Sequence, residues 1–325
     1  MHPIRRICSK LAVAGLCALV STAAWSQDWP GRPIRVIVPY PPGAFSDTVT
    51  RIVVEGVAKR MGKTIIVENK GGANGMLGVS EVSRATPDGY TFGTIIPAYV
   101  VSQHLYNKIP FDPENLVGVA SLGSTPLVLS ARKDAPFSTV EELVAYAKAN
   151  PGRITFGSSG IGSSAHLNSV VFQRLTDTKM MHVPYKGSVA AKKDLMSGEI
   201  DILFDTPLSL ASPGKEGQIK LLGVVSDQRM PLMPDVPTLS EQGIDTDSMT
   251  GSWVAMLAPK GTPPAILDRM ASEIGAVVKD PAVVDRLEKL GVFPMYKNVA
   301  DFNAFLKKED VLWGRMVRDA NVPKE

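Results

Sequence analysis

The residues best suited to binding a small anion lie in a loop at positions 40–47, between an apolar strand-like segment and a helical one. Backbone N–H groups in the first turn of a helix have no intrahelical acceptor, and that end of a helix is electropositive. The loop therefore predicts an anion site that needs no Arg or Lys, although a plain turn fits the residues equally well. For Asp47 alone, capping of the helix is favoured over ligand contact. The candidate ligand residues are Tyr40, Pro42, Gly43, Ala44, Phe45, Ser46 and Asp47.

A second loop of the same kind, at positions 157–166, is rich in Gly and Ser. Small residues let a ligand approach the backbone, and hydroxyl groups can donate hydrogen bonds to it. A lone His so close to a helix start more often caps or packs than catalyses. The candidate ligand residues are Ser158, Ser159, Gly160, Gly162, Ser163, Ser164 and His166.

A third candidate pair, Asp205 and Thr206, follows a strand-like segment at 200–204. Asp205 is suited either to accept hydrogen bonds from a ligand or to tie the cleft loops together. An Asp that only forms the turn before Thr-Pro is equally consistent with the sequence.

Motifs for the common catalytic chemistries are missing from these loops. Ser163, not Lys, follows Gly162, so the loop is no P-loop for triphosphates. The loose dinucleotide pattern at 160–165 has no ribose-binding acid after the next strand, and the loop has no Gly-x-Ser-x-Gly elbow. Neither a second His nor a carboxylate pair lies at metal-ligand spacing from the histidines beyond the N-terminal segment, His104, His166 and His182. We therefore expect no catalytic residue, no metal and no cofactor, and a secreted enzyme is the least favoured reading.

The N-terminal segment 1–26 has the pattern of a signal peptide. Three basic residues precede an uncharged, mostly apolar run at 11–24, which is too short to span a bilayer. Small residues at the end of that run predict cleavage after Ser26. Leu16 precedes Cys17 where a lipoprotein signal needs a small residue, so we expect no lipid anchor and a protein exported to the periplasm.

Removal of the segment 1–26 changes the composition of the chain. It takes away three of the 35 Lys and Arg residues, leaving as many as the 32 Asp and Glu residues. A net charge of zero supplies no basic field for nucleic acid or anionic lipid. Both cysteines are also lost, so the mature chain must be stabilised by its apolar core alone, and about 300 residues are enough for a sizeable one.

The order of predicted elements indicates an α/β fold. Strand and helix patterns alternate from 34 to 96 and again from 127 to 225, which predicts two parallel sheets covered by helices, and three helical stretches follow residue 258. We expect a discontinuous first domain at 27–127 plus 251–325 and a second at 128–250, with a ligand cleft between them. Helix caps are predicted at Ser46 or Asp47, and at Ser138 with Glu141 completing a capping box.

Several ordered motifs give the chain a family resemblance that covers nearly all of residues 27–325. They are the loop Val38-Pro39-Tyr40-Pro41-Pro42-Gly43-Ala44-Phe45-Ser46-Asp47, then Val67-Glu68-Asn69-Lys70, Pro87-Asp88-Gly89-Tyr90-Thr91, Phe156-Gly157-Ser158-Ser159-Gly160, His182-Val183-Pro184-Tyr185-Lys186-Gly187, Pro234-Asp235-Val236-Pro237-Thr238 and Ala258-Pro259-Lys260-Gly261-Thr262-Pro263. Together they resemble the Bug family, the extracytoplasmic solute receptors of tripartite tricarboxylate transporters.

The resemblance implies a two-domain Venus-flytrap fold of the type II periplasmic binding class, without catalysis or cofactor. It implies a small carboxylate ligand, such as a di- or tricarboxylate, an amino acid or an aromatic acid, held by the first two loops through main-chain groups and water. The implied partners are the membrane subunits of the transporter, or alternatively a sensor kinase that reads the closed form, and we expect a monomer.

Three positions depart from the family pattern and leave the identity of the ligand open. Ala44 replaces a second Gly, Val170 stands where an acid is common, and Ala190 replaces a Pro. Phe45 adds an aromatic face at the cleft, and we expect Tyr99 to add another from the loop after Ile96.

Overall fold

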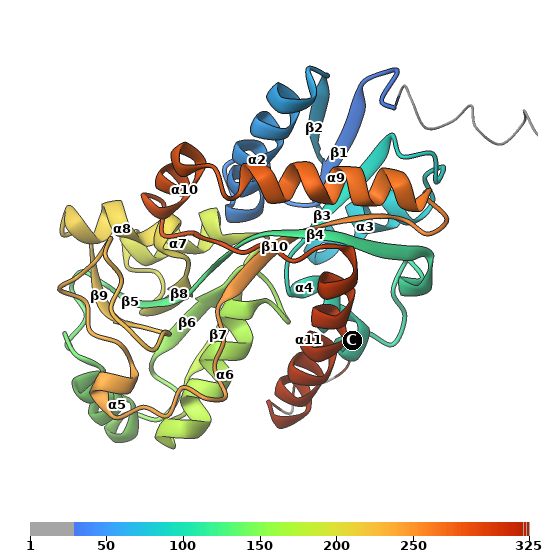
Figure 1. The fold of residues 1–325 in the computed structure, drawn as a ribbon. Coiled ribbons are helices and arrows are strands. Elements are labelled where there is room, and N and C mark those ends of the chain that lie inside the picture. Colours follow the sequence, from blue (N-terminus) through green and yellow to red (C-terminus); the bar gives the residue numbers. More distant parts are fainter. Residues whose placement is uncertain (1–28, 321, 323, 325) are drawn as a thin grey trace, which may run out of the picture.

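The computed structural model describes residues 29–320, 322 and 324, so the predicted signal peptide at 1–26 lies outside the described residues. Within this range the strands form two separate sheets (Figure 1). The six-stranded sheet has the order β11-β4-β10-β3-β1-β2, in which β1, β2 and β3 run parallel and β10 runs antiparallel to both β3 and β4. Its strands are β1 (Ile34–Val38), β2 (Ile65–Asn69), β3 (Thr91–Ile95), β4 (Leu116–Thr125), β10 (Ser252–Pro259) and β11 (Phe293–Pro294).

The five-stranded sheet has the order β7-β6-β8-β5-β9, with β6, β7 and β8 parallel and β5 antiparallel to β8 and β9. Its strands are β5 (Val128–Arg132), β6 (Thr155–Ser158), β7 (Met181–Pro184), β8 (Ile202–Asp205) and β9 (Ile219–Val224). All of these strands lie within 128–250, whereas the strands of the larger sheet lie within 27–127 and 251–325. The domain boundaries at those residues stay a prediction.

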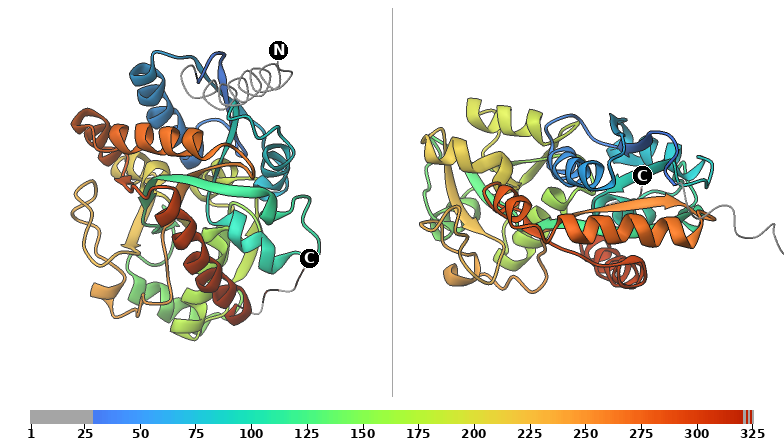
Figure 2. Two further views of the ribbon diagram at one scale, coloured as in Figure 1. Left: turned by 45° about the vertical axis from the view of Figure 1, so that its right-hand side comes forward. Right: turned by 45° about the horizontal axis from the view of Figure 1, so that its top comes forward.

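Helices cover both faces of each sheet (Figure 2). Those around the larger sheet are α2 (Phe45–Met61), α3 (Met76–Ser83), α4 (Ala98–Leu105), α9 (Pro264–Val277), α10 (Pro281–Glu288) and α11 (Val299–Asp319). Those around the smaller sheet are α5 (Val140–Ala149), α6 (Ser164–Thr176), α7 (Ser188–Ser197) and α8 (Pro207–Lys215). Short 3-10 turns are η1 (Ala73–Gly75), η2 (Pro113–Asn115) and η3 (Ser240–Gln242).

Strand β10 shows why the larger sheet needs helices on both sides. All of its residues are buried. Val254 and Met256 belong to the core under α2 and α9, while Ala255 and Leu257 belong to the core on the opposite face. Successive side chains of a strand point to opposite faces, so an apolar residue at every position requires cover on both.

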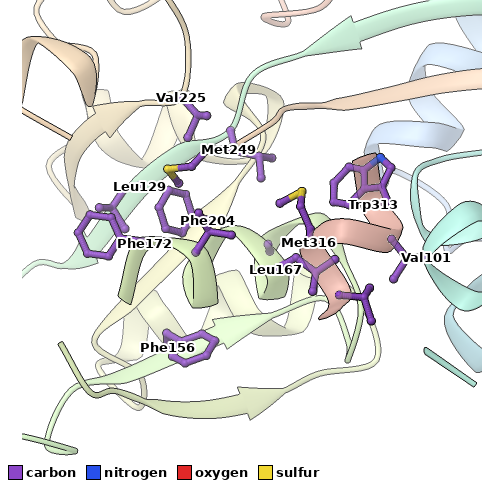
Figure 3. Packing of buried hydrophobic residues seen from close by; sticks show 14 of the residues in the cluster. Val101, Leu129, Phe156, Leu167, Phe172, Phe204, Val225, Met249, Trp313 and Met316 are labelled. Atoms are coloured by element: carbon purple, nitrogen blue, oxygen red, sulfur yellow. The ribbon is translucent and has the colours of Figure 1, made fainter. Parts of the chain in front are cut away.

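Each sheet together with its helices forms one lobe of the protein, and helix α11 joins the two lobes. Met316 of α11 lies in one hydrophobic cluster with Leu167 of α6, and Figure 3 shows these side chains close together. At the other end of the cluster, Glu309 accepts hydrogen bonds from the indole nitrogens of Trp253, at 2.6 Å, and Trp313, at 2.8 Å. This buried carboxylate fixes α11 to β10, where the chain returns from the smaller sheet to the larger one.

The alternation of strands and helices is confirmed, but four helices and strands were not predicted. They are α4, β4, α8 and the two-residue strand β11. Gly118, Ser121 and Gly123 interrupt the apolar pattern of β4, and the Thr-Pro start of α8 resembles a turn. Pro213 inside α8 argues against a helix by propensity, so tertiary packing decides this element.

Both predicted helix caps are wrong. Ala44, through its backbone alone, is the N-cap of α2. The capping box of α5 is shifted by one residue, because Thr139 accepts from the Glu142 N–H while the Glu142 carboxylate accepts from the Ser138 N–H. A capping pattern in sequence predicts that a helix starts, but neighbouring polar residues leave its first residue ambiguous.

Candidate ligand-binding site

A cavity of about 340 Å³ lies where the carboxyl ends of β1, β6 and β8 meet. In an α/β fold this is where ligands bind, because the loops there open into helix N-termini. Nine of the predicted ligand residues line the cavity: Tyr40, Ala44, Phe45, Ser46, Ser159, Ser163, Ser164, Asp205 and Thr206. Eight do not line it: Pro42, Gly43, Asp47, Tyr99, Ser158, Gly160, Gly162 and His166.

The β1–α2 loop presents unpaired backbone donors to the cavity. Ala44 gives α2 no side-chain cap, and the N–H groups of Phe45 and Ser46 have no acceptor among the described residues. Both residues line the cavity. The first turn of α2 therefore points its free donors and the positive end of its dipole at the cavity.

Asp47 positions this loop from behind. Its buried carboxylate accepts hydrogen bonds from the Gly43 N–H at 2.9 Å, the Arg51 Nε at 2.9 Å and the Asn69 amide at 2.8 Å. Asn69 also donates to the Tyr40 carbonyl at 2.9 Å, which ties the loop to the end of β2. Because the hydrogen-bond partners of this carboxylate all belong to the protein, Asp47, which does not line the cavity, holds the loop in position.

The β6–α6 loop presents a second set of unpaired donors. Ser163 caps α6 by accepting from the His166 N–H at 3.3 Å. The N–H groups of Ser164 and Ala165 have no acceptor among the described residues, and both residues line the same cavity. Four main-chain donors from two helices thus face one space.

Two stacked histidines support the β6–α6 loop from below. His166 Nδ1 accepts from the Gly162 N–H at 3.1 Å, so the ring proton of neutral His166 lies on Nε2. The rings of His166 and His182 stack at 4.1 Å between centroids. Burial, and secondly the nearby His182, lowers the pKa of His166 to about 3; burial lowers the pKa of His182 to about 4. Both rings are therefore neutral near neutral pH.

Ser158 and His182 form a hydrogen-bonded pair that resembles a nucleophile and its base, with 2.7 Å between Oγ and Nε2. Ser158 is fully buried, is absent from the cavity lining, and also donates to the Gly160 carbonyl at 3.0 Å. A nucleophile must reach its substrate, so this pair shapes the loop instead.

Asp205 sits at the edge of the cavity with one oxygen used and one covered. Oδ1 accepts from the Thr206 N–H at 2.8 Å, while Oδ2 is inaccessible and has no hydrogen-bond partner among the described residues. Burial raises the pKa of this carboxyl, and the nearby Ser209, the Thr206 N–H and the charge of Lys192 oppose the rise.

Tyr99 does not reach the cavity. It lies in α4, a helix where a loop was expected, and its ring stacks on Phe111 at 5.6 Å between centroids. The aromatic face of the cavity comes from Phe45 and Tyr40 instead.

Three functional candidates were missed by sequence reasoning. Lys186, just before α7, and Lys193, in the middle of α7, line the cavity. The motif containing Lys186 had served only to identify the family. Asn74 lines the cavity too and donates to the Ile161 carbonyl at 3.2 Å, so it bridges the two lobes. A signal for the two lysines was present in the sequence. The β7–α7 loop is a third strand–helix loop at the same edge of the sheets, so its side chains were also candidates to line the cavity.

The described part of the chain contains neither a group of side chains that could bind a metal ion nor a helix that could span a membrane. Nowhere in 29–320 do three His, Cys, Asp or Glu residues gather as a metal would require. None of the helices described there is long and apolar enough to cross a bilayer.

Comparison with known proteins gives a family match over most of the chain. A model of the tripartite tricarboxylate transporter family receptor matches residues 49–322. A UPF0065 protein of Bordetella pertussis is 34% identical over 293 residues, covering 90% of each chain. The protein BugT of the same organism is 31% identical over 312 residues, covering 95% of this chain and 94% of that one.

Solved structures agree with the family match. The R. palustris protein Rpa4515 with adipate is 27% identical, with a TM-score of 0.87 over 90% of this chain and 99% of that one. MatC from Rhodopseudomonas palustris with bound malate is 28% identical, with a TM-score of 0.82 over 89% of this chain and 100% of that one.

Two lobes with converging strand–helix loops, together with these likenesses, define a periplasmic-binding-protein fold of the Venus-flytrap type, as predicted. The chain belongs to the tripartite tricarboxylate transporter receptor family, to which the Bug proteins belong, so this prediction is confirmed. Membership in this family makes the protein a solute-binding receptor and not an enzyme.

Proposed function

We propose that this receptor is exported to the periplasm, binds a small carboxylate between its lobes, and delivers it to the membrane subunits of a tripartite tricarboxylate transporter. The observation on which the proposal depends is that the first turns of α2 and α6 face one cavity with four unpaired main-chain donors, from Phe45, Ser46, Ser164 and Ala165. A carboxylate oxygen is a suitable acceptor for such donors.

The energetics of this arrangement suit a receptor that must release its ligand. A hydrogen bond to a charged group contributes about 1.5–3 kcal/mol. Three or four such bonds contribute about 5–12 kcal/mol in total. After an association cost of at least about 4 kcal/mol is subtracted, about −8 kcal/mol, or micromolar binding, is the most that these bonds support by themselves. Family relatives solved with adipate and with malate support a carboxylate as the ligand.

The main-chain donors can be tested by a matched pair of substitutions at Ser164, the first residue of α6. Proline is tolerated at this helix position, and the preceding Ser163 has the extended conformation that proline requires (φ −68°, ψ 158°). Ser164→Pro removes the N–H and the hydroxyl, whereas Ser164→Ala removes the hydroxyl alone. Calorimetry should show that Ser164→Pro weakens carboxylate binding about tenfold more than Ser164→Ala does.

The ligand class and export are tested on the protein as cells make it. Mass spectrometry of the compound released from gently denatured, purified protein should identify an acid. The carboxylate proposal is wrong if the released compound has no carboxyl group and if Ser164→Pro binds carboxylates as tightly as Ser164→Ala does. N-terminal sequencing of a periplasmic extract should give a chain that begins at Gln27.

A further inference from the structure

The side-chain amide of Asn168 connects α6 with the segment in which the chain returns from the smaller sheet to the larger one. Its Nδ2 donates to the carbonyls of Ser164, at 2.8 Å, and Thr250, at 2.9 Å, while its Oδ1 accepts from the Thr250 N–H at 3.1 Å. The side chain is fully buried. Only this orientation of the amide suits its partners, because the reverse would set a donor against the Thr250 N–H.

The returning segment leaves the lobe of the smaller sheet and enters the lobe of the larger one at Gly251. Thr250, just before it, is held by Asn168 of the first of these lobes. Ser252, just after it, pairs with Thr125 at the end of the β4–β10 ladder, in the larger sheet. A Cβ at Gly251 would clash with the Thr125 carbonyl, so the two crossing segments touch there and only glycine fits.

The outgoing segment changes lobe over an equally short stretch. Thr125 is the last residue of β4, and the Leu127 carbonyl accepts from the Val225 N–H, at the end of β9, at 2.8 Å. Pro126 alone lies between Thr125 and Leu127. Hinges of two-lobed binding proteins are a few residues, at the ends of elements, that absorb changes in φ and ψ. Gly251 can rotate about both angles, whereas the ring of Pro126 fixes φ and leaves only ψ.

We propose that Asn168 is a positioning residue for lobe closure. It holds Thr250 within the lobe of the smaller sheet, so that the returning segment bends at Gly251 alone. Because Asn168 also binds the Ser164 carbonyl, the first turn of α6, with the main-chain donors that face the cavity, keeps a fixed place relative to this pivot. Without Asn168, residues before Gly251 also rotate, and the lobes take up more relative orientations, which closure must then suppress. This motion is needed for any ligand, so the inference goes beyond the proposed function.

A matched control exists on α11, where Asn303 makes the same three bonds within a single lobe. Its Nδ2 donates to the carbonyls of Val299, at 2.6 Å, and Gly118, at 2.9 Å, and its Oδ1 accepts from the Gly118 N–H at 3.0 Å. Gly118 lies in β4 of the larger sheet, which α11 covers. Asn303→Ala therefore removes an equal set of hydrogen bonds at a place that does not cross between the lobes.

The first test measures amide hydrogen exchange by NMR in the ligand-free, unmodified mature protein. The Thr250 amide should exchange at least about tenfold more slowly than a free amide, because its bond to Asn168 stays intact while the lobes move. Asn168→Ala should abolish this protection and leave that of the Gly118 amide unchanged. Exchange of Thr250 at the rate of a free amide in the unmodified protein overturns the inference, even if Asn168→Ala does not fold.

The second test measures the spread of lobe orientations. Both cysteines of the chain lie within 1–26, so the mature protein can be spin-labelled through Lys59→Cys on α2 and Lys148→Cys on α5, two exposed positions on different lobes. Pulsed electron paramagnetic resonance on the ligand-free protein gives the distribution of distances between the labels. Asn168→Ala should broaden this distribution, because more residues can rotate, whereas Asn303→Ala should leave its width unchanged.

Urea denaturation of both variants separates closure from stability. Similar losses of stability, with a broadened distribution for Asn168→Ala alone, support the positioning role, because a purely structural role would affect the two variants alike. Equal widths for the two variants overturn it. Either result leaves the carboxylate proposal in place, since neither measurement involves a ligand.

Discussion

The β1–α2 and β6–α6 loops do the same work in the two lobes but are held in different ways. Each aims the free N–H groups of a helix at the cavity. The first is fixed by the carboxylate of Asp47, which gathers hydrogen bonds from Gly43, Arg51 and Asn69. The second is fixed by the neutral rings of His166 and His182 and by two serines, without an ion pair.

The difference shows that two loops with the same place at a helix start can be held in position by different kinds of interaction. The β1–α2 loop is open to solvent at Pro42 and Gly43. The ion pair between Asp47 and the half-exposed Arg51 therefore needs little desolvation of the guanidinium group. The two histidines that support the β6–α6 loop stack with the buried ring of Phe156, where neutral rings avoid the cost of burying charge. The two loops should therefore respond differently to substitution and to pH.

The largest effect is expected from removal of the carboxylate that fixes the first loop. Asp47→Ala leaves three donors without their acceptor and should lower the free energy of unfolding by about 2–4 kcal/mol. It should also weaken ligand binding. Urea denaturation and calorimetry measure the two effects.

A matched control for Asp47 exists on α10. Asp285 pairs with Lys289 at the same i,i+4 spacing, at 2.7 Å, but both side chains are exposed. Asp285→Ala should cost only about 0.3–0.5 kcal/mol and leave binding unchanged. A loss of less than about 1 kcal/mol for Asp47→Ala would contradict the positioning role.

The next largest effect is the loss of stability on replacing a loop glycine by alanine, which should differ between the two loops because the space around their glycines differs. Gly43 and Gly162 have similar positive φ angles, +77° and +76°. A Cβ at Gly43 meets nothing within 4 Å, whereas one at Gly162 comes within 2.5 Å of Leu105. Gly43→Ala should therefore cost about 1–2 kcal/mol from backbone strain alone, and Gly162→Ala measurably more. Denaturant titration of both variants checks this order, and equal losses would contradict it.

The pH dependence of stability should follow the second loop. The folded-state pKa values of His166 and His182, about 3 and about 4, lie below the usual value of about 6.5. The unfolded chain therefore binds protons first, and stability that is complete above about pH 6.5 falls as the pH drops toward 4. Each histidine contributes at most about 1.4 kcal/mol per pH unit.

Urea denaturation at several pH values between about 7 and 5 measures this slope. His182→Gln provides an amide for the bond to Ser158 but has no proton to bind, so it should flatten the slope. An unchanged slope in this variant would show that the histidines do not govern acid sensitivity.

The smallest effect concerns the bond between the lobes. Asn74, at φ +51°, donates to the Ile161 carbonyl. Loss of one hydrogen bond of about 0.5–1.5 kcal/mol should weaken ligand binding about two- to tenfold. Asn74→Gly removes the amide without backbone strain and so separates the bond from the conformation. Small-angle scattering with saturating ligand should give the same compact radius of gyration, with only the affinity reduced; unchanged affinity would mean that the bond does not favour closure.

Local patterns predicted most of the fold. The alternation of strands and helices at 34–96 and at 127–225 was predicted, because apolar runs closed by turn residues define strands locally. Element ends failed where several polar residues compete for one cap, as before α2 and α5. Tyr99 was misplaced because a helix was not recognised between Ala98 and Leu105.

By itself the sequence determined the alternation of strands and helices and the two loops at helix starts that we propose as the anion site, because capping and turn chemistry act over a few residues. The tertiary structure alone decided that these loops face one cavity, that Asp47 supports its loop, and that Lys186, Lys193 and Asn74 border the same cavity. Contacts between residues far apart along the chain depend on how the two sheets and α11 pack. No local pattern specifies that packing, because it is a property of the whole core.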